Sequence, residues 1–206
     1  MTMARLSPAS LAMLAAGLAM TLSGCGGLLH SDLPPETTYW LEPSPGDAPH
    51  SPAVAALRVE VHGTPGFESD RLLVQGPGPV MRRYANARWA DTVPRVVLAF
   101  VRADLPARET VTRTMTGSSG TDDTGLLVLE VRAFNARHTG PDTAPSVELE
   151  LRGYLRCRDA DVPLHYREQS SAADNRLHAV VAAFQRNLDT VMGEIAADVA
   201  SACSDS

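Results

Sequence analysis

The segment Val147-Glu-Leu-Glu-Leu-Arg-Gly-Tyr-Leu-Arg-Cys157 alternates apolar and polar side chains along its whole length. A period of two is typical of a β-strand that buries one face and exposes the other. The same alternation runs from Leu127 to Ala133, and residues 139–145 between the two segments contain the glycine and prolines of a loop. The two segments are therefore predicted to pair as an antiparallel hairpin.

Shorter segments with strand character lie on either side of this hairpin. Residues 57–61 alternate in the same way, and a further strand is expected at 164–168. Residues 72–75 and 80–84 read as two short strands joined by Gly76-Pro-Gly-Pro79. Because proline cannot donate to a strand ladder, pairing there is limited to an edge or a loop.

Two segments repeat apolar residues at the three- and four-residue spacing of a helix. The first follows Asp91, a candidate N-cap, and runs to Leu105; Trp89 starts its stripe and is expected in the core. The second follows Asp174, also a candidate cap, and its stripe ends on Cys203. Each helix has one apolar stripe, so both are expected to lie on a sheet.

Residues 1–24 have the pattern of a secretory signal, with Arg5 ahead of an uncharged apolar run from Leu6 to Leu22. Leu22-Ser-Gly-Cys25 resembles the bacterial lipobox, which implies cleavage before Cys25 and a covalent lipid on its thiol. An ordinary signal peptide that happens to contain a cysteine is the alternative. Glycines follow Cys25, where an aspartate would be the inner-membrane retention signal, so by this resemblance the anchor is expected in the outer membrane.

The remaining chain is expected to form one domain. Residues 25–56 are interpreted as a lipidated tether, a brief β-prone run at 38–41 and a proline-rich linker, and residues 57–206 as a single α+β periplasmic domain. The chain has 206 residues and a net charge of −6, and this acidic balance argues against nucleic acid as a partner.

Cysteine and histidine usage gives one candidate crosslink and no metal site. After Cys25, only Cys157 and Cys203 remain, and both lie on apolar stripes. In an oxidising compartment they are a candidate disulfide between strand and helix, although two buried thiols would give the same pattern. The six histidines are scattered without ligand spacing, so no metal is expected.

Nothing in the sequence indicates catalysis. No G-x-S-x-G elbow is present, and Glu148 and Glu150 alternate with arginines on a solvent face. The chain is therefore expected to be non-enzymatic, with no catalytic residue and no cofactor beyond the lipid on Cys25.

Two groups of residues are candidates for partner binding. Arg152, Arg156 and Arg158 lie on the polar face of the predicted strand, where a partner would meet charge. Tyr39 and Trp40 lie near the tether and could face lipid or a neighbouring subunit.

The order of these features resembles the PqiC-like lipoproteins, auxiliary components of ABC-type lipid transport systems that work with MCE-domain proteins. The matching segments are Cys25, Tyr39-Trp-Leu41, Pro65 with Phe67, 74–84 leading to Trp89-Ala-Asp-Thr-Val-Pro94, and Val131-Arg-Ala-Phe-Asn-Ala-Arg137. The likeness spans nearly the whole chain after the signal. One departure is Gly63-Thr-Pro-Gly-Phe67, where the family more often has Val-Pro-x-Tyr-Leu.

The resemblance implies an α+β domain with a mostly antiparallel sheet and two helices on one face, similar to the N-terminal domain of TolB. It also implies a non-enzymatic accessory subunit that works with an MCE-domain protein and an ABC permease and ATPase, supports envelope integrity, and could form a homo-oligomer. The alternative is a lipoprotein that assembles or regulates another envelope machine, such as peptidoglycan synthesis.

Overall fold

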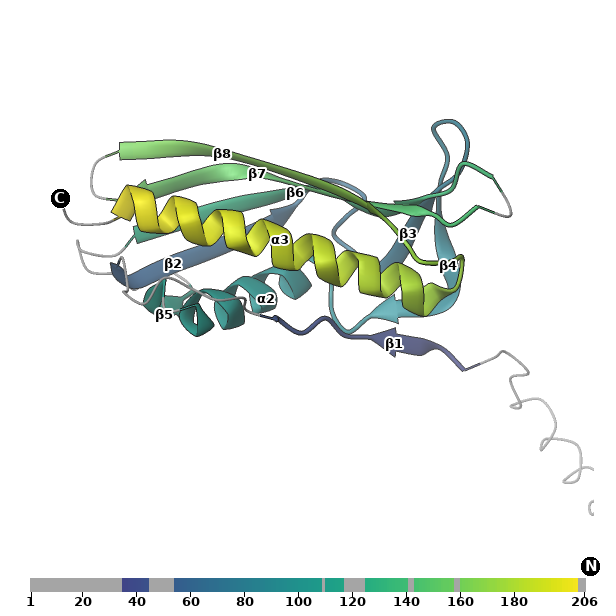
Figure 1. Ribbon diagram of the computed structural model, residues 1–206, viewed down its shortest axis with the longest axis horizontal. Coiled ribbons are helices and arrows are strands. Elements are labelled where there is room, and N and C mark those ends of the chain that lie inside the picture. Colours follow the sequence, from purple (N-terminus) through teal and green to yellow (C-terminus); the bar gives the residue numbers. More distant parts are fainter. Residues whose placement is uncertain are drawn as a thin grey trace, which may run out of the picture. The chain divides into compact units, whose positions relative to one another are not determined.

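The computed structural model describes residues 35–44, 54–108, 110–116, 125–140, 143–157 and 160–203. All elements described there belong to the unit Glu36–Ser206, and they form an eight-stranded sheet with two helices on one face (Figure 1). The expected α+β class is confirmed. The sheet is mixed rather than purely antiparallel, because four of its strand pairs are parallel. Cys25 lies outside the described residues.

The centre of the sheet is the predicted hairpin. β6 (Gly125–Arg137) pairs antiparallel with β7 (Ser146–Cys157), which in turn pairs antiparallel with β8 (Ala160–Ser171). Side chains at alternate positions of β7, such as Leu149 and Leu151, are buried beneath the helices. This confirms the hairpin and the predicted faces of β7 and of β6 up to Val131. The expectation for Ala133 is wrong, because the register shifts between Val131 and Ala133 and the buried face continues with Phe134 and Ala136.

The other edge of β6 is shared by two strands that follow one another. β2 (Val54–Gly63) pairs with the first half of β6 and β3 (Arg71–Gln75) with its end, and both are parallel to it. β5 (Val111–Met115) adds a parallel edge to β2. The sequence interpretation did not include β5.

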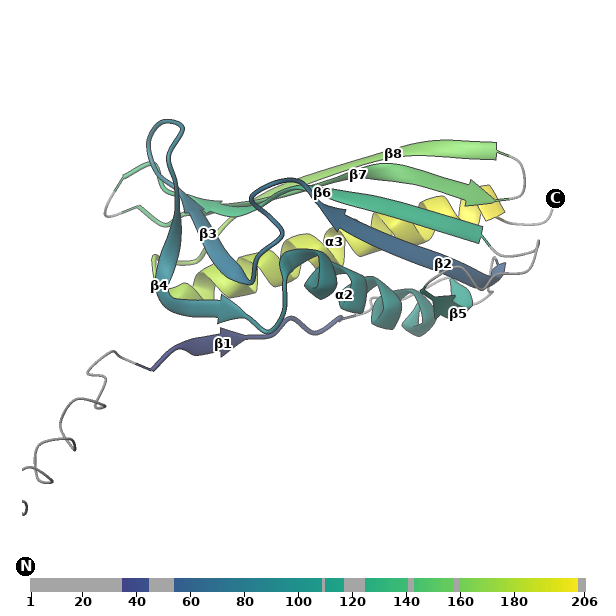
Figure 2. The ribbon, with the colours of Figure 1, turned by 180° about the vertical axis from the view of Figure 1, so that it is seen from behind.

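The strands β3 and β4 (Met81–Trp89) form an antiparallel hairpin that projects from one end of the sheet (Figure 2). Leu73 pairs with Arg83, but Arg71 pairs with Arg88, so β4 has extra residues between the two pairs. Asn86 lies in this irregular stretch with a φ of 53°, in the left-handed region. Such bulges bend a strand, which accounts for the projection of the hairpin.

The folded unit begins earlier than residue 57. β1 (Thr37–Tyr39) pairs in parallel with the end of β4, and Leu41 just after it is buried in the core. The backbone N–H of Glu42 donates to Gln185 of the second helix at 3.0 Å, and the backbone N–H of Ser44 donates to the Asp189 carboxylate at 3.1 Å. Part of the expected linker is therefore held against the helical layer.

The two helices are α2 (Val93–Ala107) and α3 (Leu177–Cys203). The cap of α2 differs from the expectation, because Thr92 is the N-cap and Asp91 instead accepts a hydrogen bond from the Thr92 N–H at 2.7 Å. Likewise, Asp174 accepts from the Arg176 N–H at 2.8 Å, ahead of α3. Both aspartates form turns that lead into the helices and do not cap them directly.

Aromatic rings fill the core where β4, β6 and α3 meet. Trp89, 1% exposed, contacts Phe134 and Phe184 edge-on at centroid distances of 5.4 and 5.1 Å, and the two phenylalanine rings stack at 4.6 Å. Trp89 thus lies in the core, as expected. No helix in the described part of the chain is long and apolar enough to cross a membrane.

An ion pair is buried where the helices approach each other. Arg108, at the end of α2, donates from Nε to a carboxylate oxygen of Asp104 and from Nη2 to the backbone carbonyl of Asp189 at 3.4 Å. Asp104 is fully buried, and its Oδ1 has no hydrogen-bond partner among the described residues. Burial raises the pKa of Asp104 above its ordinary value, although Arg108 opposes the shift.

Candidate functional site

The predicted partner-binding residues do not come together. Arg152 and Arg156 lie on β7, on the sheet face away from the helices, whereas Tyr39 and Trp40 lie at β1 on the other side of β6 in the strand order. Arg158 is outside the described residues. The arginine group and the aromatic group are therefore two separate candidate surfaces.

The two aromatic residues at β1 differ in burial: one packs against the core and the other is exposed to solvent. Tyr39 packs against the core, and its backbone carbonyl accepts from the Ala90 N–H at 2.9 Å. Trp40 points the other way and is 67% exposed, the largest exposure among the big hydrophobic side chains described. Of the two, only Trp40 presents a large apolar surface to a partner.

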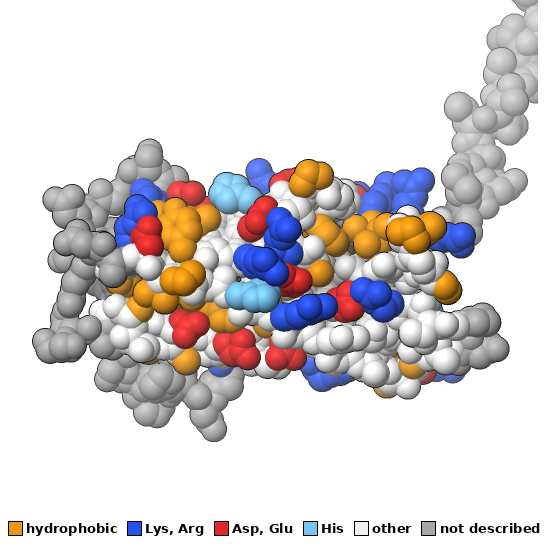
Figure 3. Space-filling model, turned by 90° about the horizontal axis from the view of Figure 1, so that it is seen from above, with side chains coloured by type: hydrophobic (Ala, Val, Ile, Leu, Met, Phe, Trp, Pro, Cys, Tyr) orange, Lys and Arg blue, Asp and Glu red, His pale blue; other side chains and the backbone are white. Residues whose placement is uncertain are grey.

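The outer face of the sheet carries a band of charged side chains (Figure 3). Arg152 donates to Glu150 at 2.8 Å, and His165 on β8 lies 3.2 Å from the same carboxylate. Burial alone would raise the pKa of Glu150, but the hydrogen bond and charge of Arg152, with His165, hold it below its ordinary value. Arg152 is thus matched by a neighbouring carboxylate.

Farther along β7 lies a patch that we call the distal patch, made of Tyr154, Arg156, Asp161 and Pro163. Arg156 forms a two-pronged ion pair with Asp161 at 2.6 and 2.9 Å and lies over the Tyr154 ring at 5.5 Å from its centroid. Pro163 pairs with Tyr154 in the β7–β8 register. A tyrosine beside an arginine is a composition enriched at protein interfaces.

The hairpin end has a different surface. Val80 and Met81 are 49% and 43% exposed at the tip of the β3–β4 hairpin, and the exposed Arg82 and Arg83 follow them. In the described part of the chain, neither of these guanidinium groups has an ion-pair or hydrogen-bond partner. Figure 3 shows hydrophobic and arginine side chains gathered at this end. The tip therefore combines exposed apolar groups with unpaired positive charge.

The tip is shaped by its glycines and prolines. Gly78 has a φ of 83°, in the left-handed region that favours glycine, and its carbonyl accepts from the Gln75 side chain at 3.2 Å. The Gly76 N–H donates to the Val80 carbonyl at 3.3 Å and closes the loop. Residues 77–79 therefore form the outer end of the loop, and Val80 and Met81 lie directly behind it.

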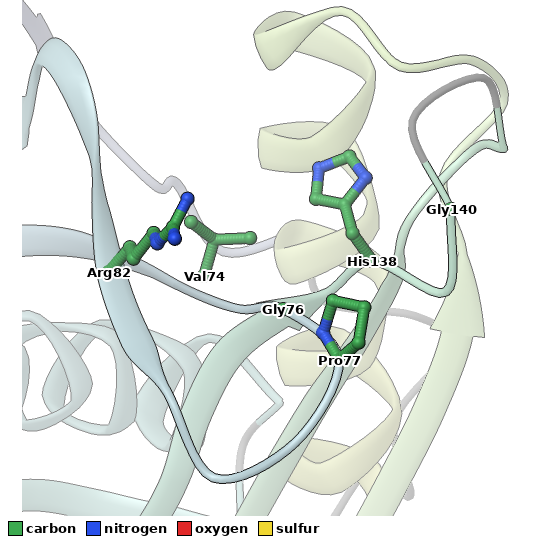
Figure 4. A pocket seen from close by; sticks show the side chains of 6 residues that line it. All are labelled: Val74, Gly76, Pro77, Arg82, His138 and Gly140. Atoms are coloured by element: carbon green, nitrogen blue, oxygen red, sulfur yellow. The ribbon is translucent and has the colours of Figure 1, made fainter.

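A pocket of about 400 Å³ lies between this hairpin and the β6–β7 loop (Figure 4). Its lining residues are Val74, Gly76, Pro77, Arg82, His138 and Gly140. At its edge the Tyr84 hydroxyl and His138 Nε2 are 3.2 Å apart, and burial raises the pKa of Tyr84. The lining of the pocket is mostly apolar and includes one arginine and one histidine, and none of its lining residues carries a carboxylate.

The sequence interpretation missed the hairpin end as a site. Residues 72–75 and 80–84 were predicted as strands, but no function was assigned to Val80 and Met81. The available signal was two apolar residues directly after Gly76-Pro-Gly-Pro79 and directly before two arginines. The contact between Tyr84 and His138 joins residues 54 positions apart, so no local sequence pattern could have predicted it.

The described residues contain no group of three or more His, Cys, Asp and Glu side chains able to hold a metal ion. The distal patch and the tip of the β3–β4 hairpin offer groups suited to binding: exposed apolar side chains, arginines and an ion pair.

No protein-family model matches the sequence, and neither does any curated protein. Among solved structures, the fold is similar to that of a Xanthomonas campestris protein of the DUF330 family, with a TM-score of 0.70 and 19% identity, over 81% of this chain and 96% of that one. A second crystal structure, of an uncharacterized protein, has a TM-score of 0.66 and 12% identity, over 81% of this chain and 99% of that one. The chain therefore has the fold of these proteins.

Proposed function

We propose that this chain is a PqiC-like, lipid-anchored accessory subunit of an ABC/MCE-type lipid transport system, held at the periplasmic face of the outer membrane. The observation that carries the proposal is the lipobox-like Leu22-Ser-Gly-Cys25 ahead of a domain with the DUF330 fold. The subunit performs no reaction and binds no cofactor other than the lipid on Cys25. It acts by binding, and ATP hydrolysis belongs to another protein.

The partner in this proposal is the MCE-domain protein, and the distal patch is its docking surface. Arg156 and Asp161 lie near the end of β7 that is remote from the β6–β7 loop. Ten residues of strand separate Ser146 from Arg156, which is about 34 Å at the usual rise per residue. A patch that far from the hairpin end can meet a partner that arrives from across the periplasm.

The test is a pull-down of the full-length, membrane-extracted protein with mass spectrometry of its partners. Recovery of an MCE protein with its permease is the expected result. A Cys25→Ala variant identifies the associations that need the lipid. Recovery of cell-wall synthases without MCE proteins overturns the transport role and favours the regulatory alternative. Recovery of no partner also overturns the transport role.

The docking surface is tested with charge reversal. Arg156→Glu removes the ion pair with Asp161 and is expected to lower MCE recovery at least tenfold with an unchanged melting temperature. Arg95→Glu is the matched control, because Arg95 is exposed on α2 in the helical layer. Equal recovery with both variants rules out the distal patch. The resemblance also implies a possible homo-oligomer. Size-exclusion chromatography with light scattering tests it, and a monomer at high concentration would count against it.

A further inference from the structure

The exposed tip of the β3–β4 hairpin is not used by the proposed docking surface, and it combines exposed apolar side chains with two arginines. The protein carries a net charge of −6, yet Arg82 and Arg83 have no carboxylate partner among the described residues. The two large apolar side chains beside them, Val80 and Met81, are half exposed. Apolar groups next to arginines suit an interface with phosphate headgroups above hydrocarbon.

The point where the chain enters the domain lies on the same side as this tip. β1 is parallel to β4, with Thr37 opposite Ala87, and β4 starts at the tip with Met81. The chain therefore enters the sheet at the end of the molecule that carries this hairpin (Figure 2). Six residues of strand lead from Ala87 back to Met81, so along the bent strand the two lie at most about 20 Å apart.

The segment before β1 is long enough to connect this end to an anchor. Residues 26–35 separate Cys25 from Glu36, and an extended chain of that length spans at most about 35 Å. That reach exceeds the offset between the entry point and the tip. An anchored domain can therefore place the tip on the bilayer that holds its lipid.

Glu36 and its partners keep the entry point itself fixed. The Glu36 carboxylate accepts from Arg71 Nη1 at 2.5 Å and lies 3.4 Å from Arg88 Nε. These arginines are occupied by Glu36 and Asp70, which leaves Arg82 and Arg83 as the unpaired cations of the hairpin.

We propose that the tip of the β3–β4 hairpin is a second membrane contact, in which Val80 and Met81 enter the bilayer interface and Arg82 and Arg83 bind anionic lipid headgroups. This inference rests on the lipid anchor of the proposed function. The lipid on Cys25 anchors the chain, and a second contact of this kind adds to the membrane affinity. It also fixes which end of the domain faces the bilayer.

The test uses the full-length lipidated protein with a single added thiol. In the proposed mature protein, Cys25 carries lipid and Cys157 and Cys203 are joined, so Met81→Cys is the one site for an environment-sensitive fluorophore. Ala99→Cys, exposed on α2, is the matched control. The proteins are placed in vesicles of phosphatidylglycerol with phosphatidylethanolamine, and in vesicles of phosphatidylcholine alone.

The expected result is a blue shift of the fluorophore at position 81 and its quenching by brominated lipid, both absent at position 99. Both signals are expected to fall at least threefold in phosphatidylcholine vesicles and in an Arg82→Glu, Arg83→Glu background. No shift at position 81, or equal shifts at both positions, overturns the inference. A shift that appears only when the MCE partner is added also overturns it, because the tip then contacts protein.

The two proposals fail in different ways. If the tip gives no signal while the MCE partner is still recovered, only the membrane contact is wrong. If the fluorophore attaches to Cys25, that thiol carries no lipid, and the anchor of the proposed function fails together with the inference.

Discussion

Cys157 on β7 and Cys203 in the last turn of α3 have Cα atoms 5.3 Å apart and are joined by a disulfide. The bond closes a chain segment with a sequence separation of 46 residues, which contains β8 and nearly all of α3. It fastens the end of the long helix to the sheet that the helix covers.

Removing this bond is expected to destabilise the domain. In the chain-entropy account, closing a loop of this length restricts the unfolded chain, so Cys157→Ser with Cys203→Ser should lower the free energy of unfolding by about 2 to 4 kcal/mol. Urea unfolding with and without reductant measures the loss. Reductant should shift the midpoint of the parent protein and leave that of the double variant unchanged. Equal midpoints for parent and variant would contradict the prediction.

Gly153 is expected to tolerate no side chain. A Cβ at this position would lie 1.8 Å from the Val128 carbonyl oxygen on β6, so the β6–β7 ladder would have to separate. Gly153→Ala should therefore cost about 3 kcal/mol or more. Gly140→Ala is the control, because its Cβ would meet only Thr143 at ordinary contact distance. Thermal unfolding that ranks the two variants equally would refute this reasoning.

Removing one partner of the buried ion pair between Arg108 and Asp104 is expected to lower the free energy of unfolding. Arg108→Met leaves the fully buried Asp104 carboxylate without its cation and is expected to cost about 3 kcal/mol. Adding Asp104→Leu in the same chain should recover much of that loss, since no lone charge remains. A double variant less stable than the single one would show that the pair is not coupled in this way.

Asp104 should also give the stability a distinct pH dependence. Its pKa is raised in the folded state, so the folded protein holds the proton more tightly than the unfolded chain does. Its contribution is present below the ordinary value of 3.8 and is lost as the pH rises through the folded pKa. The stability difference between the parent and Asp104→Asn, measured by urea unfolding from pH 3 upward, should shift against the parent in that range. A flat difference would count against the raised pKa.

Glu150 is expected to behave in the opposite sense. Its pKa is held below 4.5, so its contribution to stability is present above that value and is lost as the pH falls through the folded pKa. Arg152→Gln removes a hydrogen bond and a positive charge and should raise the pKa of Glu150. Carboxyl-detected NMR titration reads this value directly. An unchanged titration midpoint would mean that Arg152 does not hold the carboxylate.

Much of the fold follows from local patterns in the sequence. The period of two predicted β6 and β7, and the helical stripes predicted α2 and α3. β5 was missed because Val111 is its only buried residue, and Thr112 and Arg113 are exposed, so the segment lacks a hydrophobic stripe. The parallel pairs of β6 with β2 and β3 join residues far apart in the chain and have no local signal.

The candidate sites were predicted less well than the fold. Arg156 was identified from the strand alternation, but its partner Asp161 lies across the β7–β8 turn. The exposure of Val80 and Met81 depends on the bend at Asn86, and nothing in the sequence indicates how far the hairpin projects. Exposure at a tip is a property of the assembled sheet, and local periodicity does not contain it.

The parallel pairing of β1 with β4 determines how the domain responds to mechanical force on its N-terminal chain. Only three residues of β1 are paired, Thr37 to Tyr39. A pull along the strand axis loads their hydrogen bonds together, in shear, whereas a pull across the sheet opens them one at a time. The ion pairs of Glu36 with Arg71 and Arg88 lie just before β1, so a force in either direction reaches them before it reaches the hydrogen bonds of the strand. The attachment of β1 is therefore expected to resist a pull along its axis better than a pull across the sheet.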